Sequence, residues 1–196
     1  MPNTIILASA SPRRKQLLQE ALPDIQLIIE PADIDETRHP NEDAESFVKR
    51  MAAEKARHVA QKHPNTDYLI LAADTIVVHK NDILGKPINT QHARKMLESL
   101  SDEQHVVMTA VSLIFRNQQE VFISKTTVKF ARLSSERIQN YIDSGEPMDK
   151  AGSYGIQGKA AGFVEWIQGS YTNVVGLPLA ETIQHIEDTL MRLQSP

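Results

Sequence analysis

The chain has 196 residues, of which 41% are hydrophobic and 23% charged, and its formal net charge is −4 at pH 7. This length predicts one domain or a compact two-lobed unit, and the apolar fraction argues against wholesale disorder. The weak negative charge provides no electrostatic footprint for nucleic acid or an anionic membrane. The sequence contains no cysteine, which excludes disulfides, thiolate nucleophiles and Cys-bound metal centres.

The N-terminus does not resemble a targeting segment. Its apolar run, residues 5–8, is too short for the core of a signal peptide, and the positive charges follow the run instead of preceding it. No stretch approaches the roughly 18 apolar residues that a membrane span requires. We therefore expect a cytoplasmic protein that has neither a nucleic-acid partner nor a membrane partner.

Strands and helices alternate along the chain. The predicted strands are residues 4–8, 25–29, 68–73, 76–78, 83–84, 105–116 and 120–131. The predicted helices are residues 12–22, 43–62, 90–100, 136–143 and 179–193. An acid-rich connector spans residues 30–40, and the strand that begins at residue 68 is expected to end at Asp74. The pattern predicts one α/β domain over residues 1–196, with a mixed sheet flanked by helices.

Basic residues occupy the first turn of the first predicted helix. Arg13, Arg14 and Lys15 follow Ser11 and Pro12, and no acidic residue is interleaved. Cations at a helix N-terminus are disfavoured by roughly 0.3–1 kcal/mol each, and a bound phosphate would remove this conflict. Ser9 adds a hydroxyl to the same turn. The alternative is that the arginines are solvated or paired with acids elsewhere in the chain.

Asp74 follows six consecutive apolar residues. A carboxylate so close to an apolar interior needs a metal, a cation or a proton as its partner. The position therefore suits a magnesium ligand or a base that deprotonates water. Capping of the next turn through Thr75 is the alternative role.

Glycine is concentrated late in the chain, where six of the eight glycines fall between Gly152 and Gly176. Such clustering indicates unusual backbone dihedral angles or close approach of a ligand, although a set of tight turns would give the same pattern. Within this stretch Tyr154 is a candidate for stacking and Gln157 for amide hydrogen bonding.

Three further charged residues are weaker candidates. Glu36 lies in the acidic connector, Lys55 lies on the inner part of a helix face, and Lys86 lies between Gly85 and Pro87. Each also has an ordinary explanation as a solvated or snorkelling side chain. The seven histidines show no zinc-binding spacing, and we expect them to be surface or hydrogen-bonded residues.

Together these segments resemble the Maf family of nucleoside triphosphate pyrophosphatases. The matching stretches, in family order, are LASASPRR (7–14), IDE (34–36), EKAR (54–57), AADT (72–75), LGKP (84–87), VMTAV (107–111), DKAGSYGIQG (149–158) and GSYTNVVGLPL (169–179). The resemblance implies a mainly parallel twisted sheet of the Maf and inosine-triphosphatase type, with two lobes around a central cleft. It also makes a homodimer reasonable.

The resemblance further implies an activity and a set of site residues. The activity is metal-dependent hydrolysis of a nucleoside triphosphate to the monophosphate and pyrophosphate, and it serves to clear unwanted nucleotides. The YGIQG loop resembles the branch that prefers dTTP and UTP. By position, the implied catalytic residues are Asp74, Lys55 and Lys86; the substrate-binding residues are Ser9, Arg13, Arg14, Thr75 and Gln157; and the ligands of Mg²⁺ or Mn²⁺ are Glu36 and Asp74.

Two alternatives to this activity are retained. The same reaction acting on a modified nucleotide such as 7-methyl-GTP would need a similar phosphate site, and so would a non-catalytic nucleotide-binding regulator of cell division. The presence of carboxylates and lysines together with the arginines favours catalysis over regulation. The sequence leaves open which carboxylate is the base and which is the metal ligand.

Overall fold

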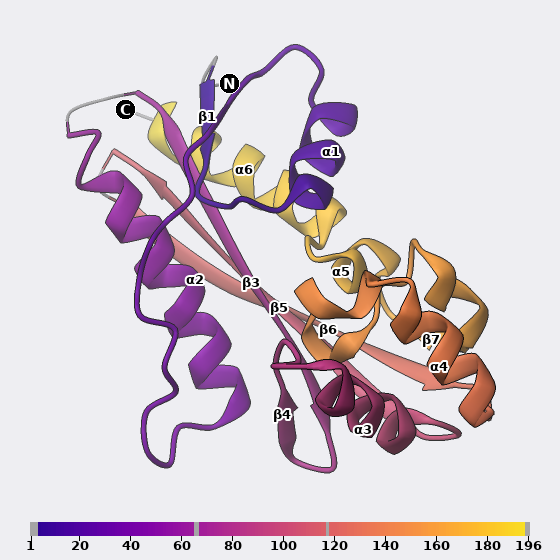
Figure 1. The fold of residues 1–196 in the computed structure, drawn as a ribbon. Coiled ribbons are helices and arrows are strands. Elements are labelled where there is room, and N and C mark those ends of the chain that lie inside the picture. The colour runs from indigo at the N-terminus through magenta and orange to yellow at the C-terminus, as the bar shows by residue number, and fades with distance from the viewer. Residues whose placement is uncertain (1–3, 65–66, 117, 195–196) are drawn as a thin grey trace. The chain divides into compact units, whose positions relative to one another are not determined.

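The computed structural model describes residues 4–64, 67–116 and 118–194 (Figure 1). The strands are β1 (Thr4–Leu7), β2 (Gln26–Ile29), β3 (Leu69–His79), β4 (Asp82–Leu84), β5 (Gln104–Phe115), β6 (Gln118–Phe130) and β7 (Val164–Gln168). The α-helices are α1 (Pro12–Ala21), α2 (Ala44–Ala60), α3 (Thr90–Leu100), α4 (Ser135–Asp143), α5 (Tyr171–Val175) and α6 (Leu179–Gln194). Three short 3₁₀ segments, η1 (Glu146–Asp149), η2 (Ala151–Ser153) and η3 (Lys159–Phe163), lie between α4 and β7.

The strands form one mixed sheet in the order β2-β1-β3-β5-β6-β7, and β4 pairs with β3 off this path. β1 is parallel to both β2 and β3, with Ile5 opposite Leu27 on one side and Leu69 on the other. β4 is antiparallel to β3, and β7 is antiparallel to β6. The mixed α/β sheet predicted from the sequence is confirmed.

The chain divides into two compact units, and several strands contribute to both. The first unit comprises residues 1–74, 109–124 and 176–196, and the second comprises residues 75–108 and 125–175. β3 passes from the first unit to the second between Asp74 and Thr75.

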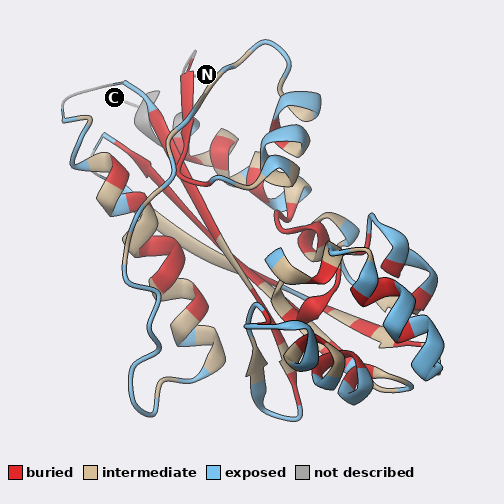
Figure 2. Cartoon of the chain, viewed as in Figure 1, coloured by how far each residue is buried: buried red, intermediate tan, exposed pale blue. Residues whose placement is uncertain are grey.

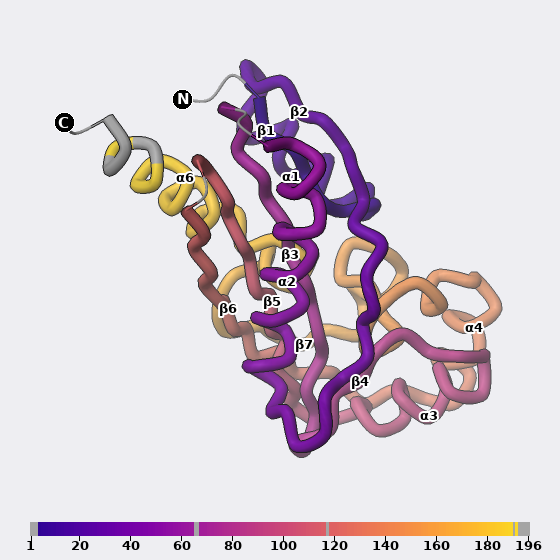
Figure 3. The backbone as a smooth tube through the Cα atoms, turned by 90° about the vertical axis from the view of Figure 1, so that its left-hand side faces the viewer, coloured from indigo at the N-terminus to yellow at the C-terminus, as the bar shows by residue number. Residues whose placement is uncertain are grey.

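In the first unit, helices cover both faces of the sheet. Because side chains alternate along a strand, Ile5 and Leu7 pack with α1 and α6 on one face, while Ile6 and Ala8 pack with α2 on the other. Figure 3 shows α2 lying in front of the strands. The central strands are buried almost throughout (Figure 2).

The second unit has its own core, built from β3, β5 and β6 together with α3, α4 and the glycine-rich segment. Phe130 is fully buried at its centre, and the rings of His105, Tyr154 and Phe163 meet it edge to face. β3 and β4 form the predicted hairpin, and its turn residues Lys80 and Asn81 both have positive φ, as a type I′ turn requires.

One predicted boundary is wrong, since β3 does not end at Asp74 but continues to His79. Ile70 and Ala72 face the α2 side of the sheet, so alternation directs Asp74 to the same side. Lys55 of α2 meets the carboxylate there, and this partner allows an acid inside the strand. Capping of a turn by Asp74 is therefore also wrong.

Across the described residues, no helix combines the length and apolar character needed to cross a membrane.

Candidate functional site

The first turn of α1 forms where the sequence predicts it. Ser11 is the N-cap, and its hydroxyl accepts a hydrogen bond from the Arg14 backbone N–H at 3.4 Å. Pro12 follows at the first helical position, where its missing N–H costs nothing. The cap sets the direction of the turn and leaves Arg13 and Arg14 half-buried near its start.

The Arg14 side chain folds back onto the strand-to-helix turn. Its Nη1 donates to Ser9 Oγ at 3.0 Å and its Nε donates to the Gly176 carbonyl at 2.8 Å. Ser9 Oγ also accepts the Ser11 N–H at 3.2 Å, and Ser9 is buried. The structure thus brings Ser9 and Arg14 together, and the arginine is held by protein oxygens and not left in solvent.

Lys55 joins two carboxylates that are far apart in the sequence. Its Nζ lies 2.7 Å from Asp74 Oδ1 and 2.6 Å from Glu36 Oε1. The side chains of Lys55 and Asp74 are 11% and 14% exposed, whereas that of Glu36 is 56% exposed. Two weak candidates from the sequence, Lys55 and Glu36, therefore share a site with Asp74, and Lys55 does not merely snorkel.

The charges of α1 and of the Lys55 cluster act on one another. Burial lowers the pKa of the Arg14 guanidinium, and neighbouring Arg13 lowers it further. The negative charges of Asp74 and Glu36 oppose this shift. The first unit therefore has positive and negative groups near one another: two half-buried arginines, and two carboxylates bridged by a lysine.

The donor set of this cluster fits a small divalent cation. Glu36 and Asp74 already converge on one positive group, the Lys55 ammonium, and they do so with hard carboxylate oxygens. Mg²⁺ typically binds through one or two carboxylates and completes its shell with water and phosphate oxygens. Within the described part of the chain, no group of three or more His, Asp or Glu residues could hold a metal alone.

The other candidates belong to the second unit. Thr75 follows Asp74 on β3 and is half-buried. Lys86 is exposed in the segment between β4 and α3, and Gln157 is exposed in the turn between η2 and η3. The exposed Gln157 amide retains a donor and an acceptor for a ligand.

The glycine-rich segment is shaped largely by contacts inside the protein. Gly152 has φ +66°, and an added Cβ would lie 2.9 Å from Val77 Cγ2. Gly169 has φ +128°, and an added Cβ would lie 2.8 Å from Thr126 Oγ1. At these two positions the backbone conformation and tight packing account for glycine.

The stacking role expected for Tyr154 is wrong, whereas the histidines agree with expectation except for two unpartnered ring nitrogens in the core. Tyr154 is buried against Phe130 and cannot offer its ring to a ligand, because its hydroxyl bonds His105 Nε2 at 2.8 Å inside the core. His79 and His105 are buried, and His79 Nε2 and His105 Nδ1 find no hydrogen-bond partner among the described residues. Burial lowers the pKa of both histidines, and that of His105 falls to about 3.

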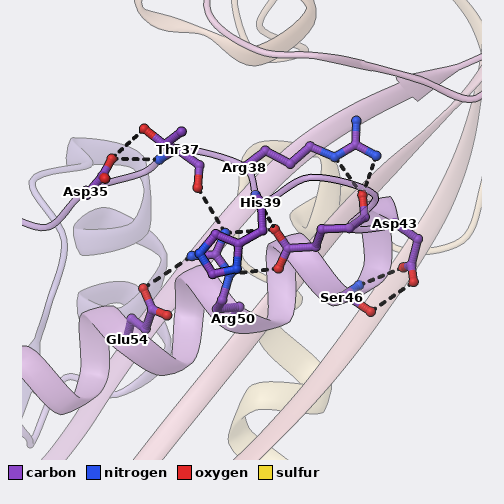
Figure 4. Close-up of polar contacts among 9 residues, drawn as sticks. Asp35, Thr37, Arg38, His39, Asp43, Ser46, Arg50 and Glu54 are labelled. Carbon is purple, nitrogen blue, oxygen red and sulfur yellow. Dashed lines mark hydrogen bonds and ion pairs between the residues drawn. The ribbon is translucent and has the colours of Figure 1, made fainter.

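Sequence reasoning missed two contributors to the first unit. Gly176 was noted only as one glycine of a cluster, yet its φ of +124° accompanies a carbonyl that accepts from Arg14. Arg50 of α2 was not singled out, although its guanidinium binds Glu42 and the Thr37 carbonyl (Figure 4). Helical spacing offered one signal, since Arg50 lies four residues before Glu54, with which it pairs at 3.4 Å.

Comparison with known proteins identifies close relatives. The family model described as Maf-like protein matches residues 4–189. A dTTP/UTP pyrophosphatase from Halalkalibacterium halodurans is 47% identical over 93% of this chain and 94% of its own length. One of the same name from Myxococcus xanthus is 48% identical over 93% of this chain and 91% of its own. A solved dITP/XTP pyrophosphatase from Mycobacterium abscessus aligns with a TM-score of 0.44 and 17% identity, over 67% of this chain and 75% of that one.

Proposed function

The chain belongs to the Maf family, and from this premise we propose that it hydrolyses dTTP and UTP to the nucleoside monophosphate and pyrophosphate. The observation that carries the proposal is the Lys55 bridge between Asp74 and Glu36, with Arg14 in electrostatic reach of both carboxylates. Such a cluster can neutralise a polyphosphate and activate water at neighbouring points. The names of relatives 47% and 48% identical supply the substrates.

In the proposed reaction, water attacks the α-phosphorus. The new bond joins the water oxygen to that phosphorus, the bond to the oxygen bridging to the β-phosphate breaks, and pyrophosphate leaves with the bond's electron pair. Asp74 accepts the proton of the attacking water. It suits this task better than Glu36, because a strand fixes it and its side chain is 14% exposed against 56%. General-base assistance is typically worth about 10²–10⁴ in rate.

Arg13, Arg14, Lys55 and Lys86 are proposed to bind the phosphates. Arginine forks match phosphate oxygens, and each charge-assisted contact contributes about 1.5–3 kcal/mol. Ser9 supports this role by holding the Arg14 guanidinium in place. Positioning and electrostatic stabilisation provide most of the catalysis in phosphoryl chemistry.

Glu36 and Asp74 are the proposed ligands of Mg²⁺ or Mn²⁺. When bound there, the ion would neutralise phosphate charge and orient the phosphate oxygens. Before the ion and substrate arrive, Lys55 supplies the positive charge that keeps the two carboxylates together.

Gln157, with Thr75, is proposed to read the base. An amide both donates and accepts, so Gln157 can pair with the imide edge of uracil or thymine. The exposure of Gln157 in a turn of the glycine-rich segment supports this assignment.

The proposal is tested by supplying the purified protein with Mg²⁺ or Mn²⁺ and a panel of dTTP, UTP, CTP, GTP and 7-methyl-GTP. We expect pyrophosphate, not orthophosphate, with dTTP and UTP turned over fastest. Release of orthophosphate alone would contradict the assigned bond. Preference for 7-methyl-GTP would overturn the substrate assignment, and binding of dTTP without hydrolysis would indicate a non-catalytic regulator.

A further inference from the structure

Glu36 lies in a segment that has no regular secondary structure of its own. Residues 30–43 form neither helix nor strand, and the Glu36 side chain is 56% exposed. Its contact with Lys55 therefore depends on how the segment is fastened. An exposed ion pair contributes only about 0–1 kcal/mol, which is too little to order a long loop alone.

Arg50 fastens this segment to α2. Its Nε lies 2.7 Å from Glu42 Oε1 and its Nη2 lies 2.8 Å from Glu42 Oε2, a two-pronged contact. The same Nη2 donates to the Thr37 carbonyl at 3.0 Å, and Nη1 lies 3.4 Å from Glu54 Oε2. Figure 4 shows the guanidinium between the segment and the helix. One side chain thus uses its fork to hold two points of the segment.

The Arg50–Glu42 pair is well shielded compared with ordinary surface pairs. The side chains of Arg50 and Glu42 are 18% and 10% exposed. Lys49, which directly precedes Arg50 on α2, pairs with Glu45, and these two side chains are 41% and 39% exposed. Arg50 holds the pKa of the Glu42 carboxyl down at about 2, so the pair stays charged at all working pH values. Bidentate arginine contacts to carboxylate are both stronger and more directional than a lysine contact.

Two anchors therefore act on neighbouring residues of the segment. Arg50 holds the carbonyl of Thr37, and Lys55, five residues later on the same helix, holds the carboxylate of Glu36. The Thr37 N–H bonds Asp35 Oδ1 at 2.9 Å, which is a local contact that shapes the segment. The two ends of the segment have contacts of their own, since Asp43 caps α2 through Ser46 and Glu30 pairs with His63.

We propose that Arg50, acting with Glu42, is a positioning residue that sets where the Glu36 carboxylate stands beside Lys55 and Asp74. The inference rests on the proposed function, because it gives Glu36 a task in the reaction. Arg50 does not touch substrate in this scheme. It acts through Glu36.

The kinetic test compares Arg50→Met with Lys49→Met, which removes the neighbouring exposed pair from the same helix. Misplacement by about 1 Å can cost 10²-fold in rate, so we expect Arg50→Met to lower kcat for dTTP by about 10- to 100-fold and Lys49→Met to leave it unchanged. Arg50→Lys retains charge but not the fork and should fall between wild type and Arg50→Met. Equal activity of Arg50→Met and Lys49→Met would overturn the proposal.

A double variant separates positioning from general structural damage. In a Glu36→Gln background, Arg50→Met should change kcat by no more than about twofold, because the group it positions is already lost. A further 10- to 100-fold loss in that background would show that Arg50 acts independently of Glu36, and would contradict the inference.

A readout without substrate tests the fastening itself. Arg38 lies in the exposed part of the segment, and its Nε donates to the Glu42 carbonyl at 2.7 Å. Trypsin should cleave after Arg38 at least about tenfold faster in Arg50→Met than in Lys49→Met if local opening controls cleavage. Equal cleavage rates would show that Arg50 does not hold the segment against α2, independently of the kcat values. If wild type fails to release pyrophosphate while the difference in cleavage persists, the proposed function is wrong, but the role of Arg50 in holding the segment is retained.

Discussion

Polar side chains have contrasting environments in the two units. In the first, Lys55, Asp74 and Glu36 are charged, mutually paired and open to solvent on the Glu36 side. In the second, His105 and Tyr154 are buried in an aromatic core, where burial lowers the pKa of the histidine and raises that of the phenol. Both residues of the second pair are therefore neutral at pH 7.

The difference separates groups that can act on a ligand from groups that stabilise the fold. Paired charges at a partly exposed site can exchange partners with an incoming phosphate or cation at modest cost, because Lys55 and Asp74 are already largely removed from water. A neutral pair inside an apolar core has no access to a ligand and contributes through its hydrogen bond and packing. The predictions below test whether each pair has the effect that its environment indicates.

The largest expected effect belongs to Asp74→Asn. Asparagine preserves the shape and can still accept a bond from Lys55, but it cannot take a proton from water. We expect turnover of dTTP to fall by at least about 10²-fold while the melting temperature changes little. Pyrophosphate release and thermal unfolding measure the two quantities.

Asp102→Asn is the matched control, since Asp102 also pairs with a lysine, Lys129, at 2.7 Å. It should leave turnover unchanged. Near-normal turnover in Asp74→Asn would remove this carboxylate from the mechanism. A collapse of stability in that variant would instead place Asp74 with the structural pairs and break the comparison.

The next effect is a pH dependence of stability that arises from His105. Its pKa is 6.5 when unfolded and about 3 when folded, so between these values the unfolded chain binds a proton that the folded chain does not. Stability therefore rises with pH across this window and is lost as pH falls, by roughly 1.4 kcal/mol per pH unit. The lowered pKa of His79 adds an effect of the same sign.

Urea unfolding at pH 4.5, 5.5 and 6.5 measures this slope. The reference variant is His105→Gln, whose amide can still bond Tyr154 but does not titrate in this range. Its slope should be smaller than that of wild type by up to one proton. The Glu42 carboxyl, with a pKa of about 2 when folded and 4.5 when unfolded, adds slope of the same sign near pH 4.5. It does so equally in both proteins and cancels in the comparison. Identical slopes would mean that folding does not lower the pKa of His105.

The sequence predicted the features that depend on local periodicity and missed those that depend on tertiary contacts. Most helices and strands were located by local periodicity, and Ser11 and Pro12 marked the start of α1. β7 and α5 were not predicted. Asp74 stood out because a charge after six apolar residues is locally unfavourable. Its true neighbour was not predictable, since Lys55 comes from α2 and only the folded sheet brings the two together.

The misjudged positions share one cause. The end of the strand at Asp74 and the stacking role of Tyr154 were both inferred from residue type. In each case a partner distant in the sequence changed the outcome, with Lys55 allowing β3 to continue and Phe130 enclosing His105 and Tyr154. Tertiary contacts of this kind leave no periodic signal.

A smaller effect is expected for Gln157→Glu. The carboxylate accepts but cannot donate, so it loses one half of the amide's pairing with a uracil or thymine edge. The ratio of kcat/KM for dTTP over CTP should fall by about tenfold, which corresponds to about 1.4 kcal/mol, and the released product should remain pyrophosphate. Gln168→Glu, at an exposed position of β7, is the control. An unchanged substrate ranking would exclude Gln157 as a base reader.

The smallest effect is expected for Tyr154→Phe, and it is the counterpart of Asp74→Asn. The substitution keeps the ring against Phe130 and removes only the hydroxyl bonded to His105 Nε2. Because His105 Nδ1 has no partner among the described residues, the variant leaves both ring nitrogens of a buried histidine unpaired. The free energy of unfolding should fall by about 1 kcal/mol, measured by urea unfolding at pH 7.

Turnover of dTTP distinguishes the effect of Tyr154→Phe, which is on stability, from that of Asp74→Asn, which is on catalysis. Well below the melting transition, Tyr154→Phe should retain the turnover of wild type, because its hydroxyl faces the core and not a ligand. Tyr171→Phe, at a position 44% exposed, should change neither quantity. If Tyr154→Phe instead lowered turnover with stability intact, the neutral pair would have to act on the glycine-rich segment that carries Gln157. The contrast between a catalytic charged pair and a purely stabilising neutral pair would then not hold.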